Sequence, residues 1–197
     1  MTTQAESVVA LFRSHAAYLE GHFRLTSGLH SAGYLQCALV LQYPEAAEKL
    51  GRALAVELRQ AARAAIQLVA SPALGGLIIG HEVARALGTR FIFTERDAST
   101  RKMTLRRGFE VTPGETAVVV EDVITTGGST QEVIEALRSA GANVLAAGSI
   151  IDRSGGLAAV GAPRVALATL QLSSHQPEDC PLCAQGVPMV KPGSRPA

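Results

Sequence analysis

Hydrophobic positions near the N-terminus recur at helical spacing over residues 3–19, where Thr3 and Glu6 also have the spacing of a capping box. The pattern changes over residues 21–43, where glycines separate short extended pieces, and this predicts a small hairpin-like unit. Pro44 then suits the first turn of a long helix over residues 44–64. The first part of the chain is therefore expected to contain two helices around a small hairpin.

From residue 66 onward, short apolar runs alternate with amphipathic segments. The pattern predicts strands over 66–70, 91–95, 117–123, 144–152 and 164–172, helices over 76–87 and 131–141, and a polar connection over 96–107. Residues 109–111, the turn at 112–115 and the strand after it are expected to form a hairpin. This alternation predicts an α/β fold whose mostly parallel sheet has helices on both faces, with a small N-terminal hood.

The length of 197 residues favours one domain. We divide it into an N-terminal helix and hood segment (1–43), an α/β core (44–172) and a C-terminal tail (173–197). A net charge of +1 argues against a dedicated nucleic-acid binder. The sequence has no secretory signal pattern and no apolar run of about 18 residues, and its three cysteines do not form a disulfide scaffold. We therefore expect a cytoplasmic protein without a membrane partner.

Ligands bind such sheets at the carboxyl ends of the strands, which selects the loops at 71–76, 96–107, 121–130 and 152–156. The stretch 116–130 is the most informative, because an apolar strand there ends in Glu121 and Asp122 and a Thr/Gly loop follows. Such a loop can cradle a phosphate at a helix N-terminus, while the acids reach the hydroxyls of a sugar. We expect Ser129 and Thr130 to cap a helix that begins near Gln131. An ordinary capped turn is the alternative, although two acids at the end of an apolar strand carry a desolvation cost.

The segment VVVEDVITTGGS resembles the phosphoribosyl pyrophosphate motif of type I phosphoribosyltransferases. Residues 21–36, the pair Asp152 and Arg153, and the tail segment 180–195 resemble bacterial orotate phosphoribosyltransferases. The resemblance implies the type I fold and the transfer of ribose 5-phosphate from phosphoribosyl pyrophosphate to orotate. It also implies Mg²⁺ carried with the substrate, and a homodimer in which the loop 96–107 closes over the neighbour's site.

The resemblance also implies residue roles. Asp122 and Lys102 match catalytic positions, Thr125 and Arg153 match positions that contact orotate, and residues 23–34 match the segment that covers the orotate ring. A surface ion pair with Asp152 is the alternative role for Arg153. The positions that match phosphoribosyl pyrophosphate contacts are Glu121, Asp122, Val123, Ile124, Thr125, Thr126, Gly127, Gly128, Ser129 and Arg96.

The chain departs from well-known family members at two lysine positions, which correspond here to Thr26 and Gly75. Its loop at 96–107 carries arginines and Lys102 but no histidine. Backbone N–H groups of residues 71–76 could replace one lysine, and which loop residue contacts pyrophosphate stays open.

Cys180 and Cys183 form a lone CPLC motif. A closed zinc site would need two further ligands, for which Cys37, His175 or a partner subunit are candidates. The alternative, a turn with two thiols in the tail, is the one we expect, so no residue is assigned to a metal. His15, His22 and His81 receive no chemical role.

Two other functions compete with the orotate enzyme. One is a type I phosphoribosyltransferase that acts on a purine base, which residues 21–36 and Arg153 suit less well than an anionic pyrimidine. The other is a regulator that binds phosphoribosyl pyrophosphate and RNA, which would need a basic face.

Overall fold

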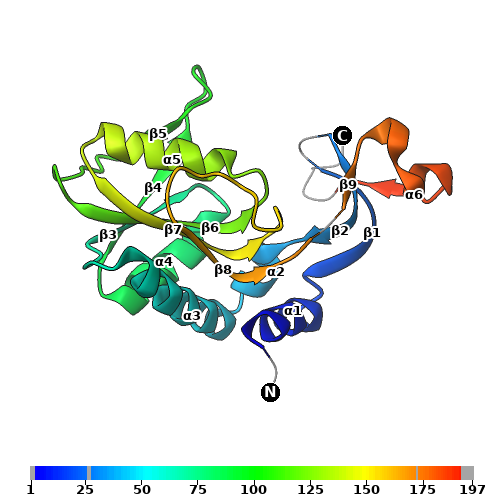
Figure 1. Ribbon diagram of the computed structural model, residues 1–197, viewed down its shortest axis with the longest axis horizontal. Helices are drawn as coiled ribbons and strands as arrows, with labels where there is room; N and C mark the ends of the chain where they lie inside the picture. The colour runs from blue at the N-terminus through cyan, green and yellow to red at the C-terminus, as the bar shows by residue number, and fades with distance from the viewer. Residues whose placement is uncertain (1–2, 26–27, 172, 192–197) are drawn as a thin grey trace.

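Two β-sheets organise the protein in a computed structural model, which describes residues 3–25, 28–171 and 173–191 (Figure 1). The large sheet has the strand order β5-β4-β3-β6-β7-β8, and only β5 runs antiparallel to its neighbour. Its strands are β3 (Leu68–Pro72), β4 (Arg90–Arg96), β5 (Met103–Leu105), β6 (Thr116–Ile124), β7 (Asn143–Asp152) and β8 (Arg164–Thr169).

Helices cover both faces of the large sheet, which confirms the predicted fold class (Figure 1). On one face lie α3 (Pro44–Ala62) and α4 (Gly76–Leu87), and on the other lies α5 (Gly128–Ser139). Leu50, Leu54 and Leu58 are spaced by one helical turn along α3, and all three are buried against the sheet. No helix in the described ranges is both long enough and apolar enough to span a bilayer.

The small sheet has the order β10-β1-β2-β9 and joins the two ends of the described chain. Its strands are β1 (Tyr18–Arg24), β2 (His30–Leu35), β9 (Ser174–His175) and β10 (Met189–Val190), with the 3₁₀ turn η1 (Pro177–Asp179) and helix α6 (Pro181–Ala184) in the tail. The β1–β2 pair confirms the predicted hairpin. Helix α1 (Gln4–Ser14) has the predicted capping box between Thr3 and Glu6.

Two predicted boundaries in this part of the chain are wrong. Helix α1 ends at Ser14 rather than continuing to residue 19, because the chain turns at Ala16 with a φ of 51° and enters β1. Residues expected to be extended form a short helix, α2 (Cys37–Leu41), whose Val40 and Leu41 are buried. The composition of this segment indicated a strand, but burial of its apolar side chains against the core favoured a helix.

The predicted hairpin of residues 109–111 with the following strand is also wrong. Residues 94–105 instead form a hairpin of β4 with β5, in which Thr94 pairs with Leu105. The Asp97 carboxylate accepts hydrogen bonds from Ser99 and Thr100 and closes the turn. Local polar hydrogen bonds form this hairpin, so hydrophobic periodicity gave no signal for it.

Candidate active site

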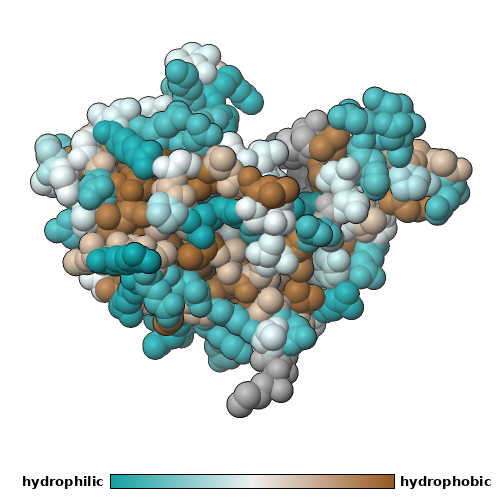
Figure 2. Space-filling model, in the orientation of Figure 1, coloured by the Kyte–Doolittle hydropathy of each residue, from teal (hydrophilic) through white to brown (hydrophobic). Residues whose placement is uncertain are grey.

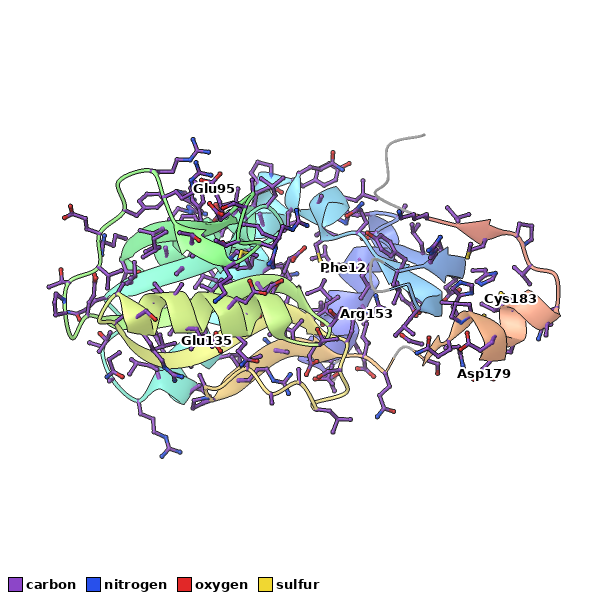
Figure 3. The ribbon with its side chains drawn as sticks, turned by 90° about the horizontal axis from the view of Figure 1, so that it is seen from above. Phe12, Glu95, Glu135, Arg153, Asp179 and Cys183 are labelled. Carbon is purple, nitrogen blue, oxygen red and sulfur yellow. The ribbon has the colours of Figure 1, made fainter. Side chains whose placement is uncertain are left out.

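A pocket of about 640 Å³ lies between the carboxyl ends of β6 and β7 and the small sheet. Strand register explains the arrangement, because Ile124 at the end of β6 pairs with Asp152 at the end of β7. Figure 3 shows Arg153 at the junction of the two sheets. The pocket is lined by Leu25, Leu29, Tyr34, Leu35, Gln36, Asp122, Val123, Thr125, Thr126, Ser129, Arg153 and Ser174.

Asp122 contributes the carboxylate that lines this pocket. Burial raises its pKa, while the backbone N–H groups of Val123 and of Asp122 itself and the thiol of Cys37 donate to it and partly offset that rise. The pKa of Tyr34 is raised by its own burial first and by the nearby negative charge of Asp122 second. The carboxylate is held in place yet remains poorly solvated, so further hydrogen-bond donors from a ligand would stabilise its charge.

Glu121 precedes Asp122 on β6 and therefore points to the opposite face of the strand. The Thr130 hydroxyl on α5 donates to its carboxylate. Burial raises the pKa of Glu121 to about 7; the Thr130 hydrogen bond lowers it, and the neighbouring charge of Asp122 adds to the rise. Glu121 is therefore a carboxyl group that titrates near neutral pH at the start of the Thr/Gly loop.

The Thr/Gly loop leads directly into α5, which begins at Gly128, three residues before the expected start. Gly127 is the N-cap residue with a φ of 84°, and a Cβ there would lie 2.8 Å from Val160 Cγ1. No side chain caps α5, so the predicted capping by Ser129 and Thr130 is wrong; Thr130 is bonded to Glu121 instead. The first-turn N–H groups are thus left for an anion, which the helix dipole also favours.

Gly75 lies opposite Asp122, in the loop between β3 and α4. A Cβ at this position would lie only 2.7 Å from Asp122 Oδ1. Because residue 75 is a glycine, the Asp122 carboxylate can occupy this space. Well-known family members have a lysine at the corresponding position. The sequence signal for this close approach was the pair Gly75 and Gly76, which follows the buried strand β3. The other such position, Thr26, lies outside the described residues.

Arg153 follows β7 and reaches toward the small sheet. Its Nη2 donates to Ser31 Oγ at 3.3 Å and lies 3.5 Å from the Gly33 carbonyl oxygen. Burial lowers the pKa of this half-buried guanidinium. The alternative of an ion pair with Asp152 is wrong, because Asp152 is buried and pairs with Arg164. Arg153 therefore presents a charge to the pocket with no carboxylate partner among the described residues.

The two basic residues expected from the loop 96–107 do not line this pocket. Arg96 pairs with Glu132 on α5, with Nη1 2.9 Å from Glu132 Oε2. Lys102 is exposed on the β4–β5 hairpin, which projects as a largely hydrophilic knob in Figure 2. Of the predicted site residues, the structure brings together in this pocket Asp122, Val123, Thr125, Thr126, Ser129 and Arg153. Glu121, Ile124, Gly127, Gly128, Arg96 and Lys102 are not among the residues that line it.

Sequence reasoning missed two residues at this site. Cys37 is buried beside Asp122, and Ser174 reaches the pocket from the tail. Neither had a local signal, since each meets the site through a contact distant in sequence.

The arrangement around Cys180 and Cys183 differs from both expectations. These residues do not lie in an isolated tail turn, because β9 and β10 pair the tail with β2 and β1. Cys37 lies beside Asp122 instead, and the ring of His175 is not part of the group that the two thiols form among the described residues. The side chains that do approach the thiols are His22 and His30.

Comparisons with known proteins agree with this geometry. A family model described as "Phosphoribosyl transferase domain" matches residues 40–182. The chain is 54% identical over 190 residues to an orotate phosphoribosyltransferase of Pelotomaculum thermopropionicum, covering 96% of this chain and 97% of the relative. It is 51% identical to that of Heliobacterium modesticaldum, covering 96% and 98%. The crystal structure of orotate phosphoribosyltransferase from Aeropyrum pernix is similar with a TM-score of 0.65, 29% identity, and coverage of 83% of this chain and 94% of the other.

Proposed function

The chain belongs to the phosphoribosyl transferase family and is an orotate phosphoribosyltransferase, and we propose that the pocket between β6, β7 and the small sheet is where it acts. In this reaction the bond between the anomeric carbon and pyrophosphate breaks, and a bond from that carbon to a ring nitrogen of orotate forms. The ring nitrogen gives up its proton, which leaves with pyrophosphate or to water. The products are orotidine 5′-phosphate and pyrophosphate. The single observation that carries the proposal is that one pocket contains the Thr/Gly loop, Asp122 and Arg153.

Each part of the pocket suits one part of the substrates. Residues 125–129 offer backbone N–H groups and hydroxyls to the 5′-phosphate at the N-terminus of α5. Asp122, and Glu121 from the other side of β6, would accept hydrogen bonds from the ribose hydroxyls and stabilise positive charge on the ring as the leaving group departs. Val123 and Ile124 form the end of the strand that joins these two parts.

Arg153 is the group that we propose to bind orotate. A guanidinium fork matches a planar anion that offers carboxylate and carbonyl oxygens. Thr125 would contact the same ring, and Tyr34, Leu25 and Leu29 would cover it. A purine base would give Arg153 no carboxylate, which disfavours a purine-specific enzyme.

The donor chemistry of the site also fits Mg²⁺, because carboxylate oxygens are ligands that this ion prefers. The ion would arrive with phosphoribosyl pyrophosphate, held by substrate oxygens and water, and the pocket carboxylate of Asp122 would favour it. When bound, Mg²⁺ would offset charge on the departing pyrophosphate.

We further propose a single catalytic domain that works as a homodimer in the cytoplasm. The β4–β5 hairpin projects from the large sheet (Figure 1), and Lys102 does not line the pocket of its own chain, which supports the idea that Lys102 closes the neighbour's site. Arg96 would then anchor the hairpin through Glu132 and help to position its basic residues near pyrophosphate. None of the three cysteines forms a disulfide, which suits a reducing compartment.

The proposal is tested by following orotate consumption optically, with and without phosphoribosyl pyrophosphate and Mg²⁺. We expect loss of orotate only when both are present, with one pyrophosphate released per orotate consumed. Adenine and hypoxanthine serve as competing bases. Turnover of a purine with none of orotate would overturn the proposal, and RNA binding without any base turnover would favour the regulator.

A further inference from the structure

Four metal-ligating side chains converge where the tail meets the small sheet, away from the proposed active site. His22 comes from β1, His30 from β2, Cys180 precedes α6, and Cys183 lies within it. One ligand atom from each residue lies within 4.8 Å of all the others. Figure 3 shows Cys183 on the far side of the small sheet from the large one. The cluster thus unites residues from both ends of the chain.

The distances are those of a tetrahedral site. His22 Nε2 lies 3.6 Å from Cys180 Sγ and 3.7 Å from Cys183 Sγ, and His30 Nδ1 lies 3.3 Å from Cys183 Sγ. The two ring nitrogens are 3.0 Å apart. A regular tetrahedron around zinc, with usual Zn–S and Zn–N bonds, has S–N edges of about 3.6 Å and an N–N edge of about 3.3 Å. Four of the six edges of the cluster are therefore close to those of such a tetrahedron, and the other two are no longer than 4.8 Å.

The hydrogen bond on the other ring nitrogen of His22 also suits a metal ligand. Its Nδ1 lies 2.8 Å from the Val187 carbonyl oxygen, which can only accept, so Nδ1 carries the proton. The lone pair of the neutral ring is then on Nε2, the atom that faces the thiols. A backbone carbonyl that fixes the tautomer in this way is the usual second partner of a metal-bound histidine.

The surroundings explain what such a site would contribute. His22, His30 and Cys180 are almost fully buried, whereas the strands that attach the tail have only two residues each. Phe23 and Leu35 are the large apolar side chains of β1 and β2 that are buried. Small units with little apolar core commonly use a structural metal.

We propose that His22, His30, Cys180 and Cys183 bind one structural Zn²⁺ that fastens the tail to the small sheet. Two sulfur and two nitrogen donors in a tetrahedron select zinc over the harder divalent ions. Binding releases the thiol protons, and both sulfurs coordinate as thiolates. The site also supports the pocket, because Ser31 follows His30 and accepts a hydrogen bond from Arg153, and Ser174 lies in the attached tail.

The test begins with the full chain, purified without chelators, kept reduced and freed of any histidine tag. Elemental analysis should find about one zinc per chain. Removal of zinc with a strong chelator should lower the thermal unfolding midpoint by about 5 °C or more, and added Zn²⁺ should restore it. Co²⁺ in place of zinc should give the thiolate-to-metal charge-transfer and ligand-field bands of a tetrahedral site.

Two matched pairs of variants identify the ligands. Cys183→Ser and His30→Asn should lose bound zinc, whereas Cys37→Ser and His175→Asn should retain about one zinc per chain. The His175→Asn control is stringent, because His175 pairs with His30 across β2 and β9. Cys183 is exposed, so its replacement by serine should disturb packing little. Loss of zinc from this variant would therefore reflect the loss of a ligand and not misfolding.

The proposal is overturned if the wild-type chain is isolated without zinc and its metal-free form takes up neither Zn²⁺ nor Co²⁺ at micromolar concentration. The four side chains would then form a hydrogen-bonded cluster only. Stoichiometric iron in place of zinc would overturn the identity of the metal. Because metal content is read independently of turnover, neither result depends on the proposed transferase activity.

Discussion

The ribose-phosphate side of the pocket comes from one continuous segment, residues 121–130, whereas the base side is assembled from segments far apart in the chain. Arg153 follows β7, Tyr34 lies on β2, and Ser174 belongs to the tail. A strand, a loop and a helix N-terminus are enough to form the first side. The second side exists only when the small sheet, the tail and the large sheet are all in place. The difference predicts that changes on the two sides will affect the two substrates differently.

The largest effect is expected from Asp122→Asn. This substitution keeps the shape of the side chain and removes a charge next to the developing positive charge on ribose. Turnover should fall by about 10²–10³-fold, as for loss of one well-placed electrostatic contact. Steady-state kinetics with both substrates provide the measurement. Glu135→Gln, on the exposed face of α5, is the matched control and should keep normal turnover. Near-normal turnover of Asp122→Asn would remove Asp122 from the mechanism.

Lys102→Ala tests whether the site also needs the neighbouring subunit. If the β4–β5 hairpin closes over the partner's pocket, turnover should fall on the order of 10²-fold, while Lys49→Ala on α3 should have no effect. Mixing Lys102→Ala with Asp122→Asn should restore activity, because each hybrid dimer has one site with both residues intact.

The complementation result is checked against subunit exchange measured by mass. Hybrids that form without recovering activity would show that Lys102 acts within its own subunit or not at all. Light scattering that finds a monomer at the assay concentration would end the shared-site model.

Arg153→Ala should affect the base side selectively. Loss of a charge-assisted contact is worth about 1.5–3 kcal/mol, so the KM for orotate should rise by roughly 10–100-fold. The KM for phosphoribosyl pyrophosphate should change little. Arg153→Lys separates charge from geometry, because lysine keeps the charge but lacks the planar fork. A full rescue by lysine would argue against bidentate binding.

The smallest effect concerns Glu121 and pH. Its pKa of about 7 in the folded protein lies above the ordinary value of 4.5, so the folded chain binds more protons than the unfolded chain between these two values. The free energy of unfolding should therefore decrease as pH rises from 4.5 to 7, and burial of Asp122 adds in the same direction.

Glu121→Gln removes the titration of that group. In the variant, the decrease in the free energy of unfolding between pH 5 and pH 8 should be smaller by about 1–3 kcal/mol. Denaturant unfolding at the two pH values measures this difference. Asp122 still titrates in this variant, so some decline should persist. An unchanged pH dependence would mean that Glu121 is ionised throughout the range.

The same comparison explains what the sequence could predict. Two acids, a Thr/Gly loop and an amphipathic helix are consecutive in residues 116–139, so both the local structure and its chemistry could be inferred from spacing. Arg153 could be placed because parallel strands bring their carboxyl ends together.

Contacts between distant segments could not be predicted. The approach of Cys37 to Asp122, and of His22 to Cys180, depends on tertiary packing that leaves no periodic signal. Polar side chains around Asp97 form the turn of the β4–β5 hairpin. In the sequence, the same residues indicated a polar connection. Sequence reasoning was reliable where neighbouring residues or the general order of a parallel sheet placed a feature, and it failed where side chains from distant segments met.

Equilibrium dialysis tests most directly whether the two sides of the pocket bind the two substrates separately. One experiment uses labelled phosphoribosyl pyrophosphate with Mg²⁺, and the other uses labelled orotate in the presence of unlabelled pyrophosphate. Wild type, Arg153→Ala and Gly127→Ala are compared. Gly127→Ala places a Cβ against Val160 and strains the loop on the ribose-phosphate side. The account predicts that Arg153→Ala weakens orotate binding by at least about tenfold and leaves phosphoribosyl pyrophosphate binding within about twofold. Gly127→Ala should show the opposite preference. Equal losses of both ligands in both variants would contradict a pocket with two separately built sides.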